Sequence, residues 1–145
     1  MPPSAADLPG EGTPGQTLAV AAQSLYLANL LLLPVLSFLA LAWLYASRRK
    51  DAPPLALCHL QQTVAASLWA GVLLVGVNAL ILALGGYDGP NVWTVVIVYF
   101  TVFHATLVMA GMYGLAKAMA GQCWRIPLVG RPLPPGCGRG VDSGG

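Results

Sequence analysis

Two long apolar stretches and the loop between them decide the fold of this chain. Residues 57–84 read LCHLQQTVAASLWAGVLLVGVNALILAL, residues 92–119 read VWTVVIVYFTVFHATLVMAGMYGLAKAM, and GGYDGPN at 85–91 joins them. Lys117 is the only Lys, Arg, Asp or Glu in either stretch. A helix needs about 20 residues to cross about 30 Å of hydrocarbon, so both stretches are long enough. The short loop, with its glycines and Pro90, predicts two antiparallel neighbouring helices, which is a membrane hairpin.

The composition of the 145-residue chain is far from that of a soluble domain. Hydrophobic residues make up 57% and charged residues 8%, against about 25% charged in soluble proteins, and the mean hydropathy is +0.70. No charged residue lies between Glu11 and Arg48, so a further apolar span precedes the hairpin. The apolar segments are continuous rather than alternating, which excludes a closed barrel. We therefore predict an all-α transmembrane helical bundle of three spans, at about 18–47, 56–84 and 92–120.

Segments rich in glycine and proline flank the predicted three-helix membrane domain at 18–125. Residues 1–17 predict a disordered outer arm, and residues 126–145 predict a Gly/Pro-rich cytoplasmic tail with a disordered end. No basic region precedes the first apolar stretch, so we do not expect a cleaved signal peptide.

The charges predict an orientation. In a three-span arrangement every basic residue falls on one side, namely Arg48, Arg49, Lys50, Lys117, Arg125, Arg131 and Arg139. Asp7, Glu11 and Asp88 fall on the other side. The positive-inside rule then places the N-terminus outside and the C-terminus in the cytoplasm of a multi-pass protein, which we assign to a bacterial inner (plasma) membrane. The basic residues form a cytoplasmic collar that contacts the lipid bilayer, and they are too few to predict a nucleic-acid partner.

Polar and small residues inside the apolar stretches are the candidates for specific contacts. Pro34 removes a backbone donor from the first span and predicts a kink there, more often a static bend than a hinge. His59 and Gln62 share one helical face. The spacing Ser67-x-x-x-Gly71 and the stripe through Gly114 allow close helix approach. Together the candidate functional or packing residues are His104, His59, Gln62, Asn29, Asn78, Ser67, Gly71 and Gly114, with Trp124 and Arg125 at the inner interface.

The two histidines raise the possibility of haem ligation, but their depths disfavour it. His59 lies within a turn of the inner end of its helix, whereas His104 precedes Met119 by about 22 Å of helix. Two axial ligands must lie at one level. An ionisable residue in the middle of a span is a functional hypothesis by default. For His104 we weigh a structural contact, bonded to Thr101 or a backbone carbonyl, against a proton-relay, ligand or substrate-path role.

The three cysteines, Cys58, Cys123 and Cys137, all map to the predicted cytoplasmic side. An odd number in a reducing compartment predicts free thiols. A metal site built from Cys58, His59 and Cys123 lacks recognisable ligand spacing and a fourth ligand, so we predict no metal. No nucleophile constellation, carboxylate pair or phosphate loop is present. We therefore predict neither a cofactor nor an enzyme.

Three short segments resemble a family of small bacterial membrane proteins of unknown function that is similar to the chloroplast inner-envelope protein-import component. They are KDAPP at 50–54, HLQQT at 59–63 and AKAMAGQCWRIPL at 116–128. The sequence departs from the family pattern at Ile126, where tyrosine is usual, and at Gln61, where an aromatic residue is expected. The resemblance covers about 43–132. It implies a bundle of three or four membrane helices and a role in assembling or moving other proteins, and it transfers no catalytic residue.

These observations lead to one preferred function and two alternatives. We predict a non-enzymatic integral membrane protein that serves as an accessory, assembly or structural subunit and packs with itself or with other membrane protein subunits. The first alternative is a component of a protein-translocation or solute channel. The second is a haem- or quinone-associated redox subunit.

Overall fold

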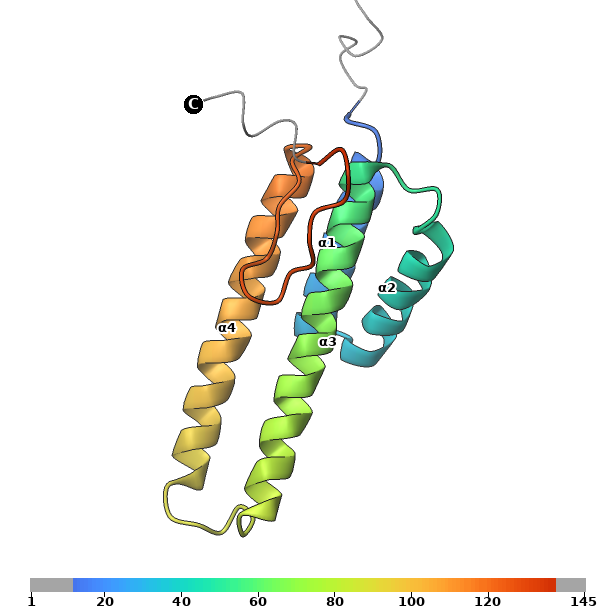
Figure 1. Ribbon diagram of the computed structural model, residues 1–145. Coiled ribbons are helices and arrows are strands. Elements are labelled where there is room, and N and C mark those ends of the chain that lie inside the picture. The colour runs from blue at the N-terminus through green and yellow to red at the C-terminus, as the bar shows by residue number, and fades with distance from the viewer. Residues whose placement is uncertain (1–11, 138–145) are drawn as a thin grey trace, which may run out of the picture.

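A computed structural model of the protein describes residues 12–137 (Figure 1). Its regular structure consists of α1 (Gln16–Leu31), α2 (Pro34–Arg48), α3 (Pro54–Ala83) and α4 (Val92–Met119), and this part of the chain contains no strand. The all-α prediction is confirmed. Only α3 and α4 are long and apolar enough to cross a membrane, so the prediction of three spans is wrong. The disorder predicted for 1–11 and 138–145 lies outside the described residues.

The first predicted span is broken into a helical hairpin at Pro34. Leu32 and Leu33 both leave helical geometry, and α2 then begins with Pro34 at its first position, where a missing N–H and a fixed φ cost nothing. Helices of 16 and 15 residues measure about 24 and 22 Å, less than the roughly 30 Å of a bilayer core. Instead of the predicted kink, the chain reverses its direction before Pro34, and α2 packs back against α1 (Figure 1). Figure 1 shows the α1–α2 turn lying about halfway along α3.

Helix α1 is the central element of the fold, because it packs against all three other helices and makes the three most extensive helix–helix contacts. Tyr26 is fully buried in the main apolar cluster, and Leu27 is buried beside it. The Tyr26 hydroxyl donates to the Leu107 carbonyl of α4 at 3.2 Å. A β-carbon at Gly111 would lie 2.7 Å from side-chain atoms of both Tyr26 and Leu27. The glycine thus lets α1 lie close against α4.

The start of α1 lies at the same end of the molecule as the start of α3 and the end of α4 (Figure 1). The Gln16 side-chain amide donates to the Met119 carbonyl. A β-carbon at Gly15 would lie 3.0 Å from those of Pro53 and Ala56. The predicted three-span arrangement would put these segments at opposite ends of the bundle, whereas the structure puts them at the same end. Residues 12–17, predicted as part of a disordered arm, form a turn and the first residues of α1.

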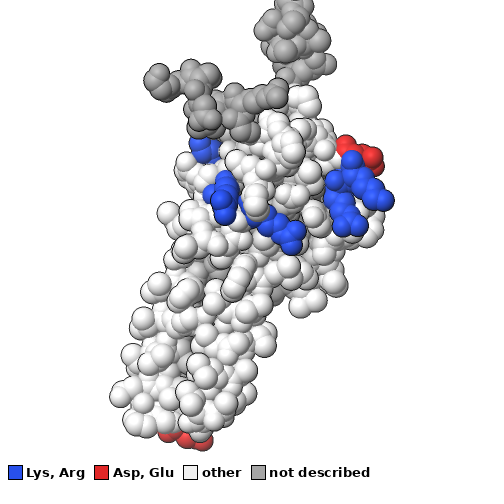
Figure 2. Space-filling view, in the orientation of Figure 1, with Lys and Arg blue, Asp and Glu red and all other residues white. Residues whose placement is uncertain are grey.

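The far halves of α3 and α4 extend beyond α1 and α2 as a bare two-helix hairpin (Figure 1). The Tyr99 hydroxyl links the pair by donating to the Leu73 carbonyl at 3.3 Å. At the tip, the rings of Tyr87 and Trp93 stack with their centroids 5.3 Å apart. In Figure 2 this half is uncharged on the visible face as far as Asp88, and the basic side chains gather over the other half. Large apolar side chains along the bare hairpin are exposed, as lipid contact requires.

Candidate functional site

A buried polar cluster lies where α1, the start of α3 and the segment after α4 meet. His59 is fully buried at its centre. Its Nε2 atom lies 3.0 Å from the Gln122 carbonyl oxygen, and its Nδ1 atom lies 2.8 Å from the Gln23 amide nitrogen. A carbonyl can only accept, so Nε2 carries the proton, and Nδ1 accepts from the Gln23 amide. His59 is thus a neutral bridge between three segments, whereas the sequence indicated only its place near one end of its helix and the face that it shares with Gln62.

Gln62 lies one turn further along α3, on the predicted shared face with His59, and it fixes the backbone of the C-terminal segment. Its side-chain amide nitrogen donates to the Arg131 carbonyl at 2.6 Å. Its Oε1 atom accepts from the Ile126 N–H at 3.4 Å. Ile126 itself is buried in the main apolar cluster. Residues 126–137, predicted as part of a loose cytoplasmic tail, are therefore folded onto α3.

Gln23 completes the cluster from α1, and Gly114 makes room for it. A β-carbon at Gly114 would come within 2.6 Å of the Gln23 amide nitrogen. The predicted packing stripe on α4 is thus a contact surface for α1 of the same chain. Gln23 was not among the predicted site residues. A glutamine within the apolar stretch before Pro34 nevertheless indicates a specific polar contact. Its Oε1 atom has no hydrogen-bond partner among the described residues.

The cysteines gather at the same end of the molecule. Cys123 and Cys137 form a disulfide, so the prediction of free thiols is wrong for these two. Cys58 is a free, fully buried thiol, as predicted, and it donates to the Trp124 carbonyl at 3.6 Å. The disulfide of Cys137 was not predicted, because that residue lies in a segment for which the sequence predicted no fixed structure.

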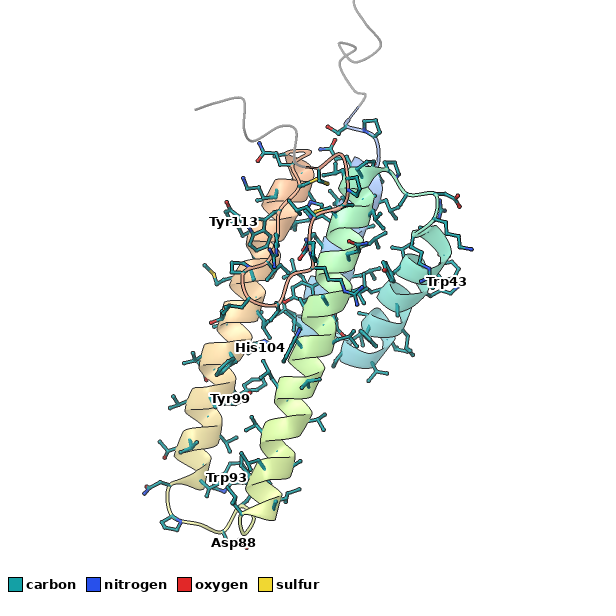
Figure 3. All side chains as sticks on the ribbon, viewed as in Figure 1. Trp43, Asp88, Trp93, Tyr99, His104 and Tyr113 are labelled. Atoms are coloured by element: carbon teal, nitrogen blue, oxygen red, sulfur yellow. A yellow bond between two sulfur atoms is a disulfide. The ribbon has the colours of Figure 1, made fainter. Side chains whose placement is uncertain are left out.

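His104 stands apart from the polar cluster, about halfway along α4 (Figure 3). It is half-buried and stacks on Phe100 with ring centroids 5.0 Å apart. No hydrogen bond from its ring is found within residues 12–137, so the predicted bond to Thr101 is absent there. His59 and His104 are not brought together. His59 bonds to the carbonyl of Gln122, which lies beyond the C-terminal end of α4.

The remaining candidates occupy separate places. Asn78 donates to the Leu74 carbonyl at 2.6 Å and accepts from the Tyr87 hydroxyl, so both of its partners belong to the same hairpin. Asn29 is half-buried, and Ser67 is buried with no partner for its hydroxyl among the described residues. Gly71 faces open space, since nothing lies within 4 Å of where its β-carbon would be.

The predicted interfacial residues Trp124 and Arg125 lie at the edge of the polar cluster. Trp124 is half-buried and packs edge-on against Tyr113, with ring centroids 4.9 Å apart. The Arg125 Nε atom donates to the Gly130 carbonyl at 3.2 Å. Trp124 thus packs the segment that follows α4 against that helix, and Arg125 stabilises the turn within the segment.

The fold and the cluster define the chain as an all-helical protein with two helices apolar enough to cross a membrane. No protein-family model, curated protein or solved structure matches it. The resemblance to the small bacterial membrane proteins therefore stays a prediction. In the cluster, the α3 side chains of His59 and Gln62 bind the backbone of the segment after α4, and Gln23 of α1 binds the His59 ring.

Proposed function

We propose that this protein is a non-enzymatic membrane subunit that assembles with a second copy of itself through the bare half of α3. The observation that carries the proposal is the environment of Gly71. This glycine has nothing within 4 Å of its β-carbon position, and it lies between Leu68 and Val75, which are 49% and 68% exposed. Small residues flanked by large apolar ones allow helices in lipid to approach closely.

The contrast with Gly114 supports this choice of surface. Gly114 is already covered by Gln23 of α1, so the stripe on α4 is used within the chain. Gly71 lies beyond the part of α3 that α1 and α2 bury. An assembly contact therefore belongs on α3, and the remaining exposed apolar side chains of the hairpin contact lipid.

We further propose that the end with the polar cluster faces the cytoplasm of a bacterial inner membrane. Every Lys and Arg among residues 12–137 belongs to the half that carries α1 and α2 (Figure 2), as the positive-inside rule requires of a cytoplasmic end. Asp88 is at the opposite tip (Figure 3). On this arrangement α3 and α4 cross the bilayer, while α1 and α2 enter it only part way from the cytoplasmic side.

The family resemblance favours a role in assembling or moving other membrane proteins. Its segments at 50–54, 59–63 and 116–128 include His59, Gln62 and Trp124, which belong to the polar cluster or its edge. This support is independent of the open surface at Gly71. The partners proposed here are the bilayer, a second copy of the chain and other membrane subunits.

Oxidative crosslinking in native membranes tests the self-assembly. A cysteine at Gly71 is expected to form a covalent dimer, whereas its matched control, Val72→Cys, points about 100° away around the helix at nearly the same depth. Val72 is 61% exposed, so both cysteines are accessible. Wild-type protein gives the background from the native cysteines. Equal dimer yields from Gly71→Cys and Val72→Cys would show that the chains do not meet specifically at Gly71.

Substitution by leucine separates assembly from folding. A β-carbon at Gly71 meets nothing within 4 Å, so we expect the Gly71→Leu protein to fold but no longer to dimerise. Val72→Leu is the control and is expected to keep the dimer. Measurement of the oligomeric state in mild detergent distinguishes the two, and a dimeric Gly71→Leu protein would contradict the proposal.

A further inference from the structure

Three cysteine sulfurs from three different segments meet at the polar end of the molecule. Cys58 belongs to the second turn of α3, Cys123 follows α4, and Cys137 lies in the folded C-terminal segment. Their Sγ atoms all lie within 4.8 Å of one another. Cys58 is fully buried and Cys137 is 7% exposed. Three sulfurs from distant positions in the sequence, two of them on buried residues and that of Cys123 on a half-buried one, are thus brought together by the fold.

The same three sulfurs have two chemical states. In the structure, Cys123 and Cys137 are joined as a disulfide and Cys58 is a thiol. On the cytoplasmic orientation proposed above, this end lies in a compartment whose thiol reductants keep cysteines reduced. Two electrons and two protons from such a dithiol or glutathione-type reductant convert the disulfide into two thiols. The site then holds three thiols.

We propose that the reduced site, Cys58, Cys123 and Cys137, binds one thiophilic metal ion of the Zn²⁺ class. Zinc–thiolate bonds of about 2.3 Å in tetrahedral geometry place sulfurs about 3.8 Å apart. All three sulfurs lie within 4.8 Å of one another, so after reduction the Cys58 sulfur has to approach by at most about 1 Å, while the Cys123 and Cys137 sulfurs move apart to the zinc-bound spacing. Side-chain rotation supplies both movements. Each thiol that coordinates the ion releases its proton to solvent. The fourth position is left for water or an incoming ligand.

The neighbouring residues suit such a site. Both ring nitrogens of His59 are engaged, by Gln23 and by the Gln122 carbonyl, so the histidine positions the segment and does not coordinate. Three thiolates around Zn²⁺ carry a net negative charge. Lys117 donates to the Gln122 side chain at 2.8 Å, so a cation contacts the residue that precedes Cys123. A bound ion would join the start of α3, the end of α4 and the C-terminal segment.

Cobalt binding to the purified full-length protein tests the proposal. Co²⁺ serves as the spectroscopic probe for Zn²⁺, added after the protein is reduced with a phosphine and the reductant is removed. We expect one Co²⁺ per chain, with sulfur-to-cobalt charge-transfer absorption, and its displacement by Zn²⁺. Protein re-oxidised to the disulfide is expected to lose this absorption. Because the titration uses reduced protein in detergent, its outcome is independent of dimerisation and orientation.

Variants identify the ligands. Cys58→Ser and Cys137→Ser are each expected to weaken Co²⁺ binding more than about tenfold, the scale of losses at metal sites. Cys137→Ser provides a second variant in case the buried Cys58→Ser protein fails to fold. Thr63→Ser changes a nearby buried residue of α3 without removing a sulfur, and it is the matched control with wild-type binding. Absence of charge-transfer absorption in the reduced wild type, or full binding by both serine variants, would overturn the proposal.

Discussion

The side-chain amide of Gln23 lies directly against Gly114, where a β-carbon would come within 2.6 Å of the amide nitrogen. The same nitrogen bonds to Nδ1 of His59 on α3. A glycine on α4 thus makes space for a hydrogen bond between α1 and α3. The short α1–α2 hairpin is held in place by this junction, as well as by the apolar packing around Tyr26.

Replacing Gly114 with alanine is expected to lower the free energy of unfolding. The added methyl group displaces the Gln23 amide from His59, and overpacking of this kind costs about 1–3 kcal/mol. Gly76→Ala is the matched control, because its methyl group meets nothing within 4 Å and alanine favours helix by about 1 kcal/mol. Unfolding in mixed detergent micelles measures both. Equal stabilities for the two alanine variants would show that Gly114 is not a close contact.

His59→Leu is expected to release the segment that follows α4. The substitution leaves the Gln122 carbonyl and the Gln23 amide without their partner, at about 1–3 kcal/mol for each buried group. The peptide bond after Arg125 should then become more accessible to trypsin. The rate of cleavage at that bond, compared with wild type, is the measurement. An unchanged rate would mean that His59 does not hold the segment.

His104→Leu is expected to leave stability nearly unchanged, within about 0.5 kcal/mol. Its ring stacks on Phe100, and leucine retains an apolar contact while breaking no hydrogen bond found in residues 12–137. The same micelle unfolding assay compares it with His59→Leu. A loss as large as that of His59→Leu would assign His104 a structural partner. Stability that is retained while a cellular phenotype is lost would favour a functional role.

The sequence predicted the α3–α4 hairpin well because both of its determinants are local. Continuous apolar runs of sufficient length predict helices in lipid, and the short loop at 85–91 requires them to be neighbours. The sequence also pointed to the small-residue stripe on α4, since small residues at helical spacing form contacts in many helix pairs, and Gly114 of that stripe lies against Gln23. What the sequence left open was its partner, which is α1 of the same chain.

The number of spans could not be predicted, because hydropathy does not distinguish one continuous helix from two shorter helices that fold back on each other. The stretch before Arg48 is apolar throughout, and Pro34 is compatible with either a kinked helix or a turn. Only the packing of α1 against α3 and α4 decides between them. The folded C-terminal segment was missed for a similar reason. The contacts of Ile126 and Gln62 join residues far apart in sequence, and the local composition of glycine and proline indicates only the absence of helix.

We propose that α1 and α2 form a hairpin that enters the bilayer and returns to the same side. Epitope tags placed before Thr13, within 85–91 and after Cys137 test it most directly in sealed membrane vesicles of known orientation. We predict that antibodies reach the first and third tags from the same side, and the loop tag only from the opposite side. A tag before Thr13 that is accessible on the same side as the loop tag would mean that the α1–α2 segment crosses the membrane, and would contradict the account.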